Sequence, residues 1–393
     1  MTADFSTDNL WMLPQAVDEI LPPEARGLEQ LRRRLLDCYD SWGYELIIPP
    51  IIEYLDSLLL GQGSDLDVQT FKLTDQLNGR TMGVRADTTP QAARIDAHKL
   101  SDPGPSRLCY VGTVLHTRPE GPDCSRNPIQ VGAELYGHSG PESDLEVIEL
   151  LLETLRLCSI PTAHLDLGHV GLFRGLAAAA GLDSAREARV FSAMQRKAVP
   201  EIAGLLDGVA PAMRDRFLAL VDLNGTTAVL AEAHERLHDC PAAVHAALDR
   251  LESLASQLQR RHPTLQLHVD LAELSGYQFH TGLVFAAFVP GCGREIARGG
   301  RYDGIGAPFG RARPATGFSA DLKQLAAVSA EAQRYAANDA ILAPWSDDPS
   351  LLVEIARLRQ RGRRVILELP GVDVSGPVAR LIRSGADWVI ESR

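Results

Sequence analysis

The residues best suited to chemistry in this chain lie between positions 273 and 318. Apolar and aromatic residues at positions 277–289 predict strands packed on both faces, and the Pro-Gly turn that follows predicts a hairpin. The Gly299-Gly300 pair lets the backbone approach a ligand closely, and Asp303 is placed to hold Arg301 by a charge-assisted hydrogen bond. These features predict the floor of a small-molecule pocket in an antiparallel sheet. An ordinary hairpin with a glycine bulge is the alternative.

A second polar group lies on the strand expected at residues 129–136, which we expect to pair with residues 108–115. Gln130, Gly132 and Glu134 share one face of that strand, because side chains alternate along it. Glutamine and glutamate inside a sheet are costly unless they meet a ligand or polar partners. This face therefore predicts part of a binding site.

A third polar group, Asp87, Thr88 and Thr89, precedes Pro90, which is expected to begin a helix. Capping of that helix is the ordinary role for at least one of the three. The others are available to face a pocket and to bind an ammonium group.

The elements that position these groups divide the chain into two domains, at residues 1–330 and 336–393. Ala-rich helical stretches at about 171–262 predict a helical insertion in the first domain. The second alternates strand, helix, strand, helix and strand, with its last helix at 378–382, which predicts a small three-strand parallel unit. Another helix should run to Leu157, with Ser143 and Glu146 as its capping box.

The composition restricts the function further. The net charge is −12, and such an acidic field disfavours nucleic-acid binding. The basic run at 357–364 is expected to be a solvated helix end, with RNA contact as the minor alternative. Six scattered Cys predict no metal site, and no dinucleotide-binding motif or other cofactor signature occurs. Neither a signal peptide nor a membrane span is predicted, so a cytoplasmic protein is expected.

These motifs, in this order, resemble histidyl-tRNA synthetases over most of residues 10–330. Residues 299–304, Gly-Gly-Arg-Tyr-Asp-Gly, are similar to a signature histidine motif of that family, and residues 107–137 to its motif 2. Pro50 matches the motif 1 proline of the family's dimer interface. The resemblance implies an α+β, class II aminoacyl-tRNA synthetase-like fold: an antiparallel sheet flanked by helices, dimeric, with a helical insertion and a small α/β C-terminal domain.

The same comparison identifies synthetase positions that this chain has changed. Cationic groups hold ATP and the carboxylate in the family, and loss of one such donor typically costs about two to three orders of magnitude in rate. The cationic positions are replaced by His116 in motif 2, Ser275 in the first histidine motif and Gln324 at the end of motif 3, and Arg118 replaces a motif 2 glutamate that helps to position ATP. The resemblance therefore implies a protein that does not adenylate an amino acid.

The resemblance implies that the amino-acid pocket of the family is kept. Asp87, with Thr89 beside it, matches the carboxylate for the substrate ammonium group, and Gln130 and Glu134 match residues that hold the substrate carboxylate and amino group. Phe279 and His280 replace a tyrosine pair of the aromatic stretch that grips imidazole. The candidate histidine-binding residues are Asp87, Thr89, Arg126, Gln130, Glu134, Tyr277, Phe279, His280 and Arg301.

A histidine pocket without adenylation chemistry is typical of the HisZ family, the regulatory subunits of short-form ATP phosphoribosyltransferase, and residues 276–282 are similar to that family. The resemblance implies a homodimer within a hetero-oligomer, with the short catalytic subunit as partner and histidine as effector. A divergent synthetase, or a paralogue that activates another small acid, is the enzymatic alternative. A structural dimer with a relic pocket is a third possibility.

Overall fold

A computed structural model describes residues 11–60, 64–100, 103–121, 124–160, 163–273, 276, 279–336, 340–372 and 379–391. Contacts along the chain divide it into two units. The first unit comprises Met1–Ile20 and Leu28–Ala332, and the second comprises Leu21–Gly27 and Gln333–Arg393. Among the described residues, no helix combines the length and apolar character needed to cross a bilayer.

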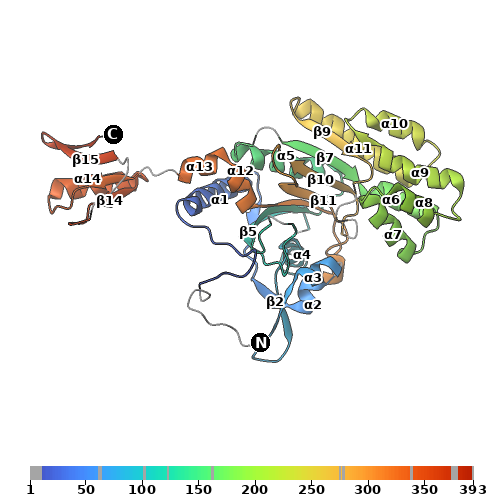
Figure 1. The fold of residues 1–393 in the computed structure, drawn as a ribbon, viewed down its shortest axis with the longest axis horizontal. Coiled ribbons are helices and arrows are strands. Elements are labelled where there is room, and N and C mark those ends of the chain that lie inside the picture. Colours follow the sequence, from blue (N-terminus) through green and yellow to red (C-terminus); the bar gives the residue numbers. More distant parts are fainter. Residues whose placement is uncertain are drawn as a thin grey trace. The chain divides into compact units, whose positions relative to one another are not determined.

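A nine-stranded sheet forms the centre of the first unit (Figure 1). Most neighbouring strands of this sheet are antiparallel, and β1–β5 and β7–β9 are its parallel pairs among the described strands. The predicted hairpins are confirmed, because β5 pairs antiparallel with β6 and β10 with β11. The strands in sheet order are β1 (Glu45–Leu46), β5 (Ser106–Thr113), β6 (Ile129–Tyr136), β12 (Ala315–Asp321), β11 (Ala297–Arg301), β10 (Leu283–Phe288), β7 (His164–His169), β9 (Gln266–Asp270) and β8 (Asn224–Gly225).

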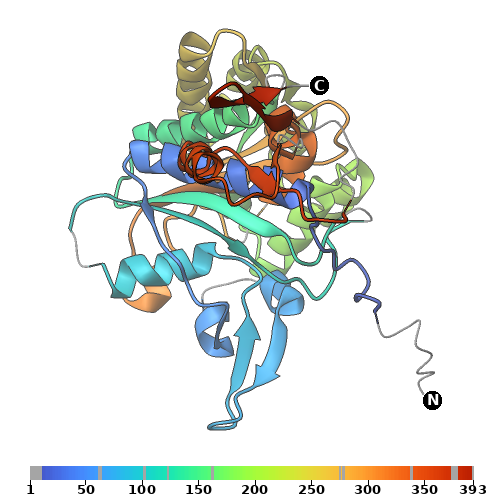
Figure 2. The same cartoon turned by 90° about the vertical axis from the view of Figure 1, so that its left-hand side faces the viewer.

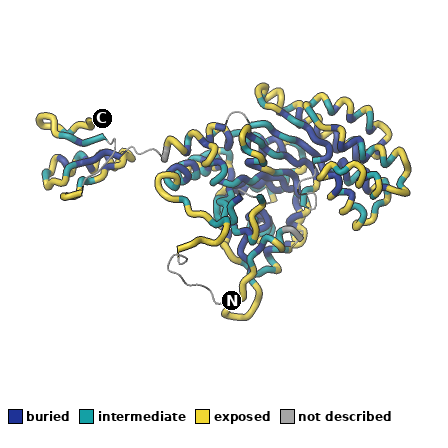
Figure 3. The backbone as a smooth tube through the Cα atoms, in the orientation of Figure 1, coloured by how far each residue is buried: buried dark blue, intermediate teal, exposed yellow. Residues whose placement is uncertain are grey.

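The two faces of this sheet have different environments. On the face that we call the helix face, Val131 and Ala133 of β6 join a large apolar core with Leu31 and Leu35 of α1. The opposite face, the pocket face, carries Glu134 and the other alternate residues of β6, and α4 packs near that strand. The buried residues of the sheet lie between the helices on the helix face and α4 on the pocket face (Figure 3). The helices that contact the sheet include α1 (Glu24–Ser41), α4 (Thr89–His98), α5 (Pro141–Leu157), α11 (Ala242–Arg261) and α12 (Leu322–Val328).

A small three-stranded sheet lies below the central sheet in Figures 1 and 2. Its strands β3 and β4 form a hairpin whose turn contains Asn78 and Gly79, and Gly79 adopts a φ of +76° that favours glycine. Its elements are β2 (Ile52–Tyr54), α2 (Leu55–Leu59), α3 (Ser64–Gln69), β3 (Phe71–Thr74) and β4 (Thr81–Val84), and η2 (Ala307–Phe309) contacts α4.

Helices occupy most of the chain between β7 and β9. They share one apolar core with the sheet, in which the rings of Phe173 and Phe217 meet edge to face at 5.8 Å. The elements of this segment before α11 are α6 (Val170–Ala179), α7 (Ser184–Gln195), α8 (Val199–Leu205), α9 (Pro211–Asp222), β8 and α10 (Val229–Arg236).

The second unit contains a four-stranded sheet in the order β14-β13-β15-β16. The helix predicted at 378–382 is wrong, because Ala379–Ser384 forms strand β15 and turns at Gly385, with φ +63°, into antiparallel β16. A short apolar run fits a strand or a helix equally well. Here its pairing with β13 and β16 makes it a strand. Its elements are β13 (Ile341–Ala343), α14 (Pro349–Gln360), β14 (Val365–Leu367), β15 and β16 (Asp387–Glu391), and α13 (Ala330–Ala336) precedes them.

The predicted capping box of α5 is also wrong. Gly140 is the N-cap, and the Ser143 hydroxyl donates to the Gly140 carbonyl at 2.9 Å instead of capping a backbone N–H. Glu146 accepts hydrogen bonds from Arg107 of β5 at 2.6 and 2.8 Å. The Ser143 hydroxyl also accepts a hydrogen bond from Arg301 at 2.7 Å, so tertiary partners use both side chains that the local pattern assigned to the cap.

Candidate functional site

One row of paired residues builds the floor of the pocket face. Glu134 of β6 pairs with Gly317 of β12, which pairs with Gly300 of β11. A Cβ at Gly317 would collide with the Glu134 carboxylate, and one at Gly300 would lie 2.7 Å from the His280 ring. Glycine is required at both positions because these two side chains lie directly over the sheet.

Glu134 is the deepest polar group of this floor, with 1% of its surface exposed. Its carboxylate accepts hydrogen bonds from the hydroxyls of Tyr110, at 3.0 Å, and Tyr302. Burial raises the pKa of Glu134 to about 8, and the bonds from Tyr302, Thr89 and Tyr110 oppose this rise. Glu134 is therefore predominantly protonated at neutral pH in this structure.

Asp87 and Gln130 form the more exposed part of the site at the start of α4. The Gln130 amide donates to Asp87 Oδ1 at 2.7 Å, and its oxygen accepts from the Thr88 N–H at 2.8 Å. Asp87 Oδ1 also accepts from the Thr89 N–H at 3.1 Å. The Thr89 hydroxyl bonds to Tyr110 at 3.2 Å, so a continuous network joins this partly exposed carboxylate to buried Glu134.

An aromatic wall stands beside Glu134. The Phe279 ring stacks on Tyr302 with centroids 4.9 Å apart, and His280 meets Phe279 edge to face at 5.4 Å. The site prediction for Tyr277 lies outside the described residues. A planar ring bound near Glu134 would therefore meet flat apolar surfaces.

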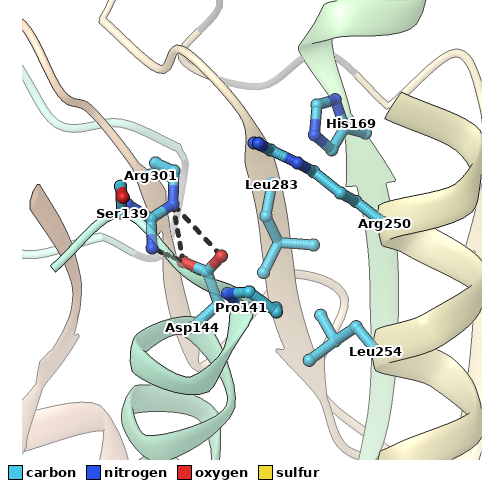
Figure 4. Close-up of a pocket in the computed structure, with 8 residues that line it drawn as sticks. All are labelled: Ser139, Pro141, Asp144, His169, Arg250, Leu254, Leu283 and Arg301. Carbon is cyan, nitrogen blue, oxygen red and sulfur yellow. Dashed lines mark hydrogen bonds and ion pairs between the residues drawn. The ribbon is translucent and has the colours of Figure 1, made fainter. Parts of the chain in front are cut away.

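Arg301 does not join these residues, because it lies on the helix face. It pairs with Thr316, one residue away from the Glu134 row, so its side chain points to the opposite side. Its guanidinium is 2% exposed and binds Asp144 of α5 at 2.9 Å and Asp303 at 3.1 Å, as Figure 4 shows for Asp144. The predicted Arg301–Asp303 bond is thus confirmed, whereas the structure places Arg301 away from the predicted pocket and uses it to hold α5 on the sheet.

Arg126 bonds to backbone carbonyls. Its guanidinium donates to the oxygens of His116 at 3.0 Å and Gln15 at 3.2 Å, and it lies over the Phe71 ring. These bonds tie the loop before β6 to the N-terminal segment, so Arg126 is not part of the Asp87–Gln130 network.

The replaced synthetase positions have other partners here. His116 is buried, and its Nε2 lies 2.9 Å from the Ala86 carbonyl, while Gln324 donates to the Glu295 carbonyl at 3.3 Å. Arg118 is exposed, and Ser275 lies outside the described residues. At the predicted replacement positions His116 and Gln324, therefore, the side chains lie against backbone carbonyls. Within the described ranges, no three His, Cys, Asp or Glu side chains gather as metal ligands.

The residues that the sequence prediction missed are Tyr110, Tyr302 and Arg298. Tyr302 follows Arg301, and strand alternation alone places the two on opposite faces. Arg298 shares a row of the pocket face with Ser319 and is exposed, with Glu295 at 3.4 Å. The alternation of side chains along residues 297–302 was the signal that could have placed Tyr302 and Arg298 on the pocket face.

Comparison with known proteins identifies the family. Residues 16–325 match a family model described as histidyl-tRNA synthetase, and residues 338–391 match the C-terminal domain of ATP phosphoribosyltransferase subunit HisZ. An ATP phosphoribosyltransferase regulatory subunit from Alkalilimnicola ehrlichii is 59% identical over 369 residues, which cover 93% of this chain and 92% of the relative. One from Pseudomonas syringae pv. tomato is 51% identical over 390 residues, or 98% of each chain. The chain belongs to the family of ATP phosphoribosyltransferase regulatory subunits.

Solved structures agree with this regulatory-subunit family. A Bacillus halodurans protein titled ATP phosphoribosyltransferase regulatory subunit/histidyl-tRNA synthetase aligns with a TM-score of 0.79 and 25% identity, over 92% of this chain and 94% of that chain. A chain of the Thermotoga maritima HisG:HisZ complex aligns with a TM-score of 0.58 and 18% identity, over 74% of this chain and 96% of that one, and shows likeness of fold. The predicted family and class II synthetase-like fold are confirmed, and the protein is a non-catalytic regulatory subunit.

Proposed function

We propose that this regulatory subunit assembles in the cytoplasm with a short-form ATP phosphoribosyltransferase catalytic subunit, activates it and makes it sensitive to histidine. One observation carries the proposal: the pocket face holds Asp87, Gln130 and Glu134 in one polar network. His116 and Gln324, where the resemblance implies that a cation is lost, lie against backbone carbonyls. Such a site retains groups that recognise an amino acid and lacks groups that would activate it with ATP.

The different burial of Asp87 and Glu134 favours histidine as the ligand. Asp87, with Gln130, is partly exposed and suits an ammonium group that stays close to water. Glu134 is buried beside the Phe279–Tyr302 stack and suits the N–H of a planar ring. Histidine carries an ammonium group and an imidazole. Because Glu134 is covered in this structure, the ligand must move part of the aromatic wall to reach it.

Feedback requires that histidine bind one state of the complex more tightly than the other. Couplings between two sites are typically about 1–3 kcal/mol, or about 5- to 150-fold in affinity. A covered pocket supports such coupling, since binding must rearrange the Phe279–Tyr302 contact.

Reconstitution tests this function directly. The chain would be co-purified with a short catalytic subunit, and phosphoribosyl transfer to ATP would be measured with and without histidine. We expect stimulation on mixing and inhibition by histidine. A failure to co-purify or to stimulate would contradict the proposal. Histidine-dependent ATP–pyrophosphate exchange by the isolated chain would instead support the divergent synthetase.

We also propose that the chain forms a homodimer through the surface around Pro50. Four large apolar residues are exposed close together in this segment, and a contiguous exposed apolar patch is typical of an interface. These residues are Leu46, Ile48, Ile51 and Ile52.

For the domain limits, we propose residues 1–330, with an insertion at about 171–262, and residues 336–393.

A further inference from the structure

A second candidate site lies far along the sheet from the Glu134 network, where β7 ends and α6 begins. Helices α6 and α11 border a groove of about 450 Å³, within the usual range for small-molecule sites. Its walls are formed by small residues such as Gly171, Gly175 and Ala247, and its charged lining residues are Arg174 and Arg250. None of its described lining residues is acidic, although the chain has a net charge of −12.

His169 places a hydrogen-bond donor at this groove. Only 6% of its surface is exposed, and its Nδ1 accepts a hydrogen bond from the Gly171 N–H at 3.1 Å, which caps α6. Burial, with the charges of Arg250 and Arg301, lowers the pKa of His169 to about 4. A neutral ring whose Nδ1 accepts must carry its proton on Nε2, and this N–H has no partner among the described residues.

Arg250 supplies a cation next to that donor. It extends from α11 across Leu283 with His169 beside it (Figure 4), and it makes no ion pair with any residue in the described ranges. The nearby Arg301 is neutralised by Asp144 at 2.9 Å, so Asp144 is already engaged. Arg250 is an exposed residue, so a ligand can reach its guanidinium from solvent without breaking an ion pair within the described ranges.

We propose that this groove binds the phosphate group of a small molecule that also carries a flat apolar part, such as a nucleotide. The guanidinium of Arg250 matches phosphate in a bidentate geometry. The Nε2–H of His169 adds a neutral donor, and the positive end of α6 lies at the same place. Glycine and alanine walls leave room for a ring to lie against the helices.

Isothermal titration of the full chain with AMP, adenosine and inorganic phosphate tests the proposal. We expect AMP to bind, phosphate to compete with it, and adenosine to bind at least about tenfold more weakly, because a hydrogen bond to a charged group is lost. Arg250→Ala should weaken AMP binding by a similar factor. His169→Asn should weaken it too, since asparagine still caps the helix but lacks the ring donor.

Arg260→Ala is the matched control, because Arg260 is exposed on the same helix outside the groove. It should leave AMP binding unchanged, and circular dichroism melting should show that all variants are folded. Absence of AMP binding by the unmodified chain, equal binding of AMP and adenosine, or unchanged binding by folded Arg250→Ala would each overturn the proposal.

Discussion

The Tyr302 hydroxyl donates a hydrogen bond to the Glu134 carboxylate, although the two residues lie 168 positions apart in the sequence. The strand order β6-β12-β11 brings them together over Gly317. Arg301, the neighbour of Tyr302, points to the other face and binds Asp144. One short segment therefore serves the pocket on one side of the sheet and anchors α5 on the other.

Buried Glu134 should make folding stability depend on pH. Its pKa is raised to about 8, above about 4.3 for an exposed glutamate. Between these values the folded chain keeps a proton that the unfolded chain has released. The unfolding free energy should therefore fall by up to about 1.4 kcal/mol per pH unit as pH rises. Urea unfolding of the parent and of Glu134→Gln, from about pH 5 to 8, checks this slope. Parallel pH profiles for the two proteins would contradict it.

Glu134→Ala should abolish histidine inhibition of the reconstituted complex and preserve its assembly. Removing Glu134 leaves the buried ring N–H of the ligand without a partner, which costs about 1–3 kcal/mol and lowers histidine affinity by about 5- to 150-fold. Activity would be titrated with histidine, using Glu142→Ala, an exposed acid of α5, as control. Unchanged inhibition of a folded Glu134→Ala complex would exclude this pocket as the effector site.

Arg301→Ala should destabilise the first unit without a direct effect on the pocket. Removing one partner of a buried ion pair typically costs about 3–5 kcal/mol, because the Asp144 carboxylate is left buried and unpaired. Chemical denaturation measures this loss. Calorimetry on the folded variant at low temperature should show near-normal histidine affinity. A large loss of affinity with normal stability would place Arg301 in the binding site instead.

Arg298→Ala should have the opposite effects from Arg301→Ala: stability should change little and histidine binding should weaken. Its side chain is exposed on the pocket face, and its pairs with Glu295 and Glu120, at 3.4 and 3.5 Å, are surface pairs. We expect stability to change by less than about 1 kcal/mol. Histidine affinity should fall several-fold, and less so at high salt, because a cation near the ligand carboxylate is lost. Arg189→Ala, an exposed change on α7, is the control, and equal affinities would remove Arg298 from the site.

Ile48→Asp should separate the proposed homodimer into monomers. Ile48 is 85% exposed next to Pro49 and Pro50, and burying an unpaired carboxylate at an apolar interface is strongly unfavourable. Light scattering after size exclusion measures the mass. Leu77→Asp is a matched control, since Leu77 is 94% exposed at the tip of the β3–β4 hairpin. An unchanged mass for Ile48→Asp would move the interface elsewhere.

Local patterns were sufficient for some elements and misleading for others. The alternation along β6 predicted that Gln130 and Glu134 share a face, and the structure confirms it. The apolar run at 378–382 suggested a helix, but pairing with β13 and β16 makes it a strand. Ser143 and Glu146 matched a cap, yet Arg107 competes for Glu146.

The sequence alone determined the family, the hairpins and the polar residues of one strand, because period and turn chemistry are encoded in neighbouring positions. Only the tertiary structure decided that Tyr110 and Tyr302 enclose Glu134, that burial raises its pKa, and that Arg301 faces α5. It alone brought His169 and Arg250 to one groove. These properties depend on which distant segments become neighbours and on how completely they exclude water, and neither is specified by a local pattern.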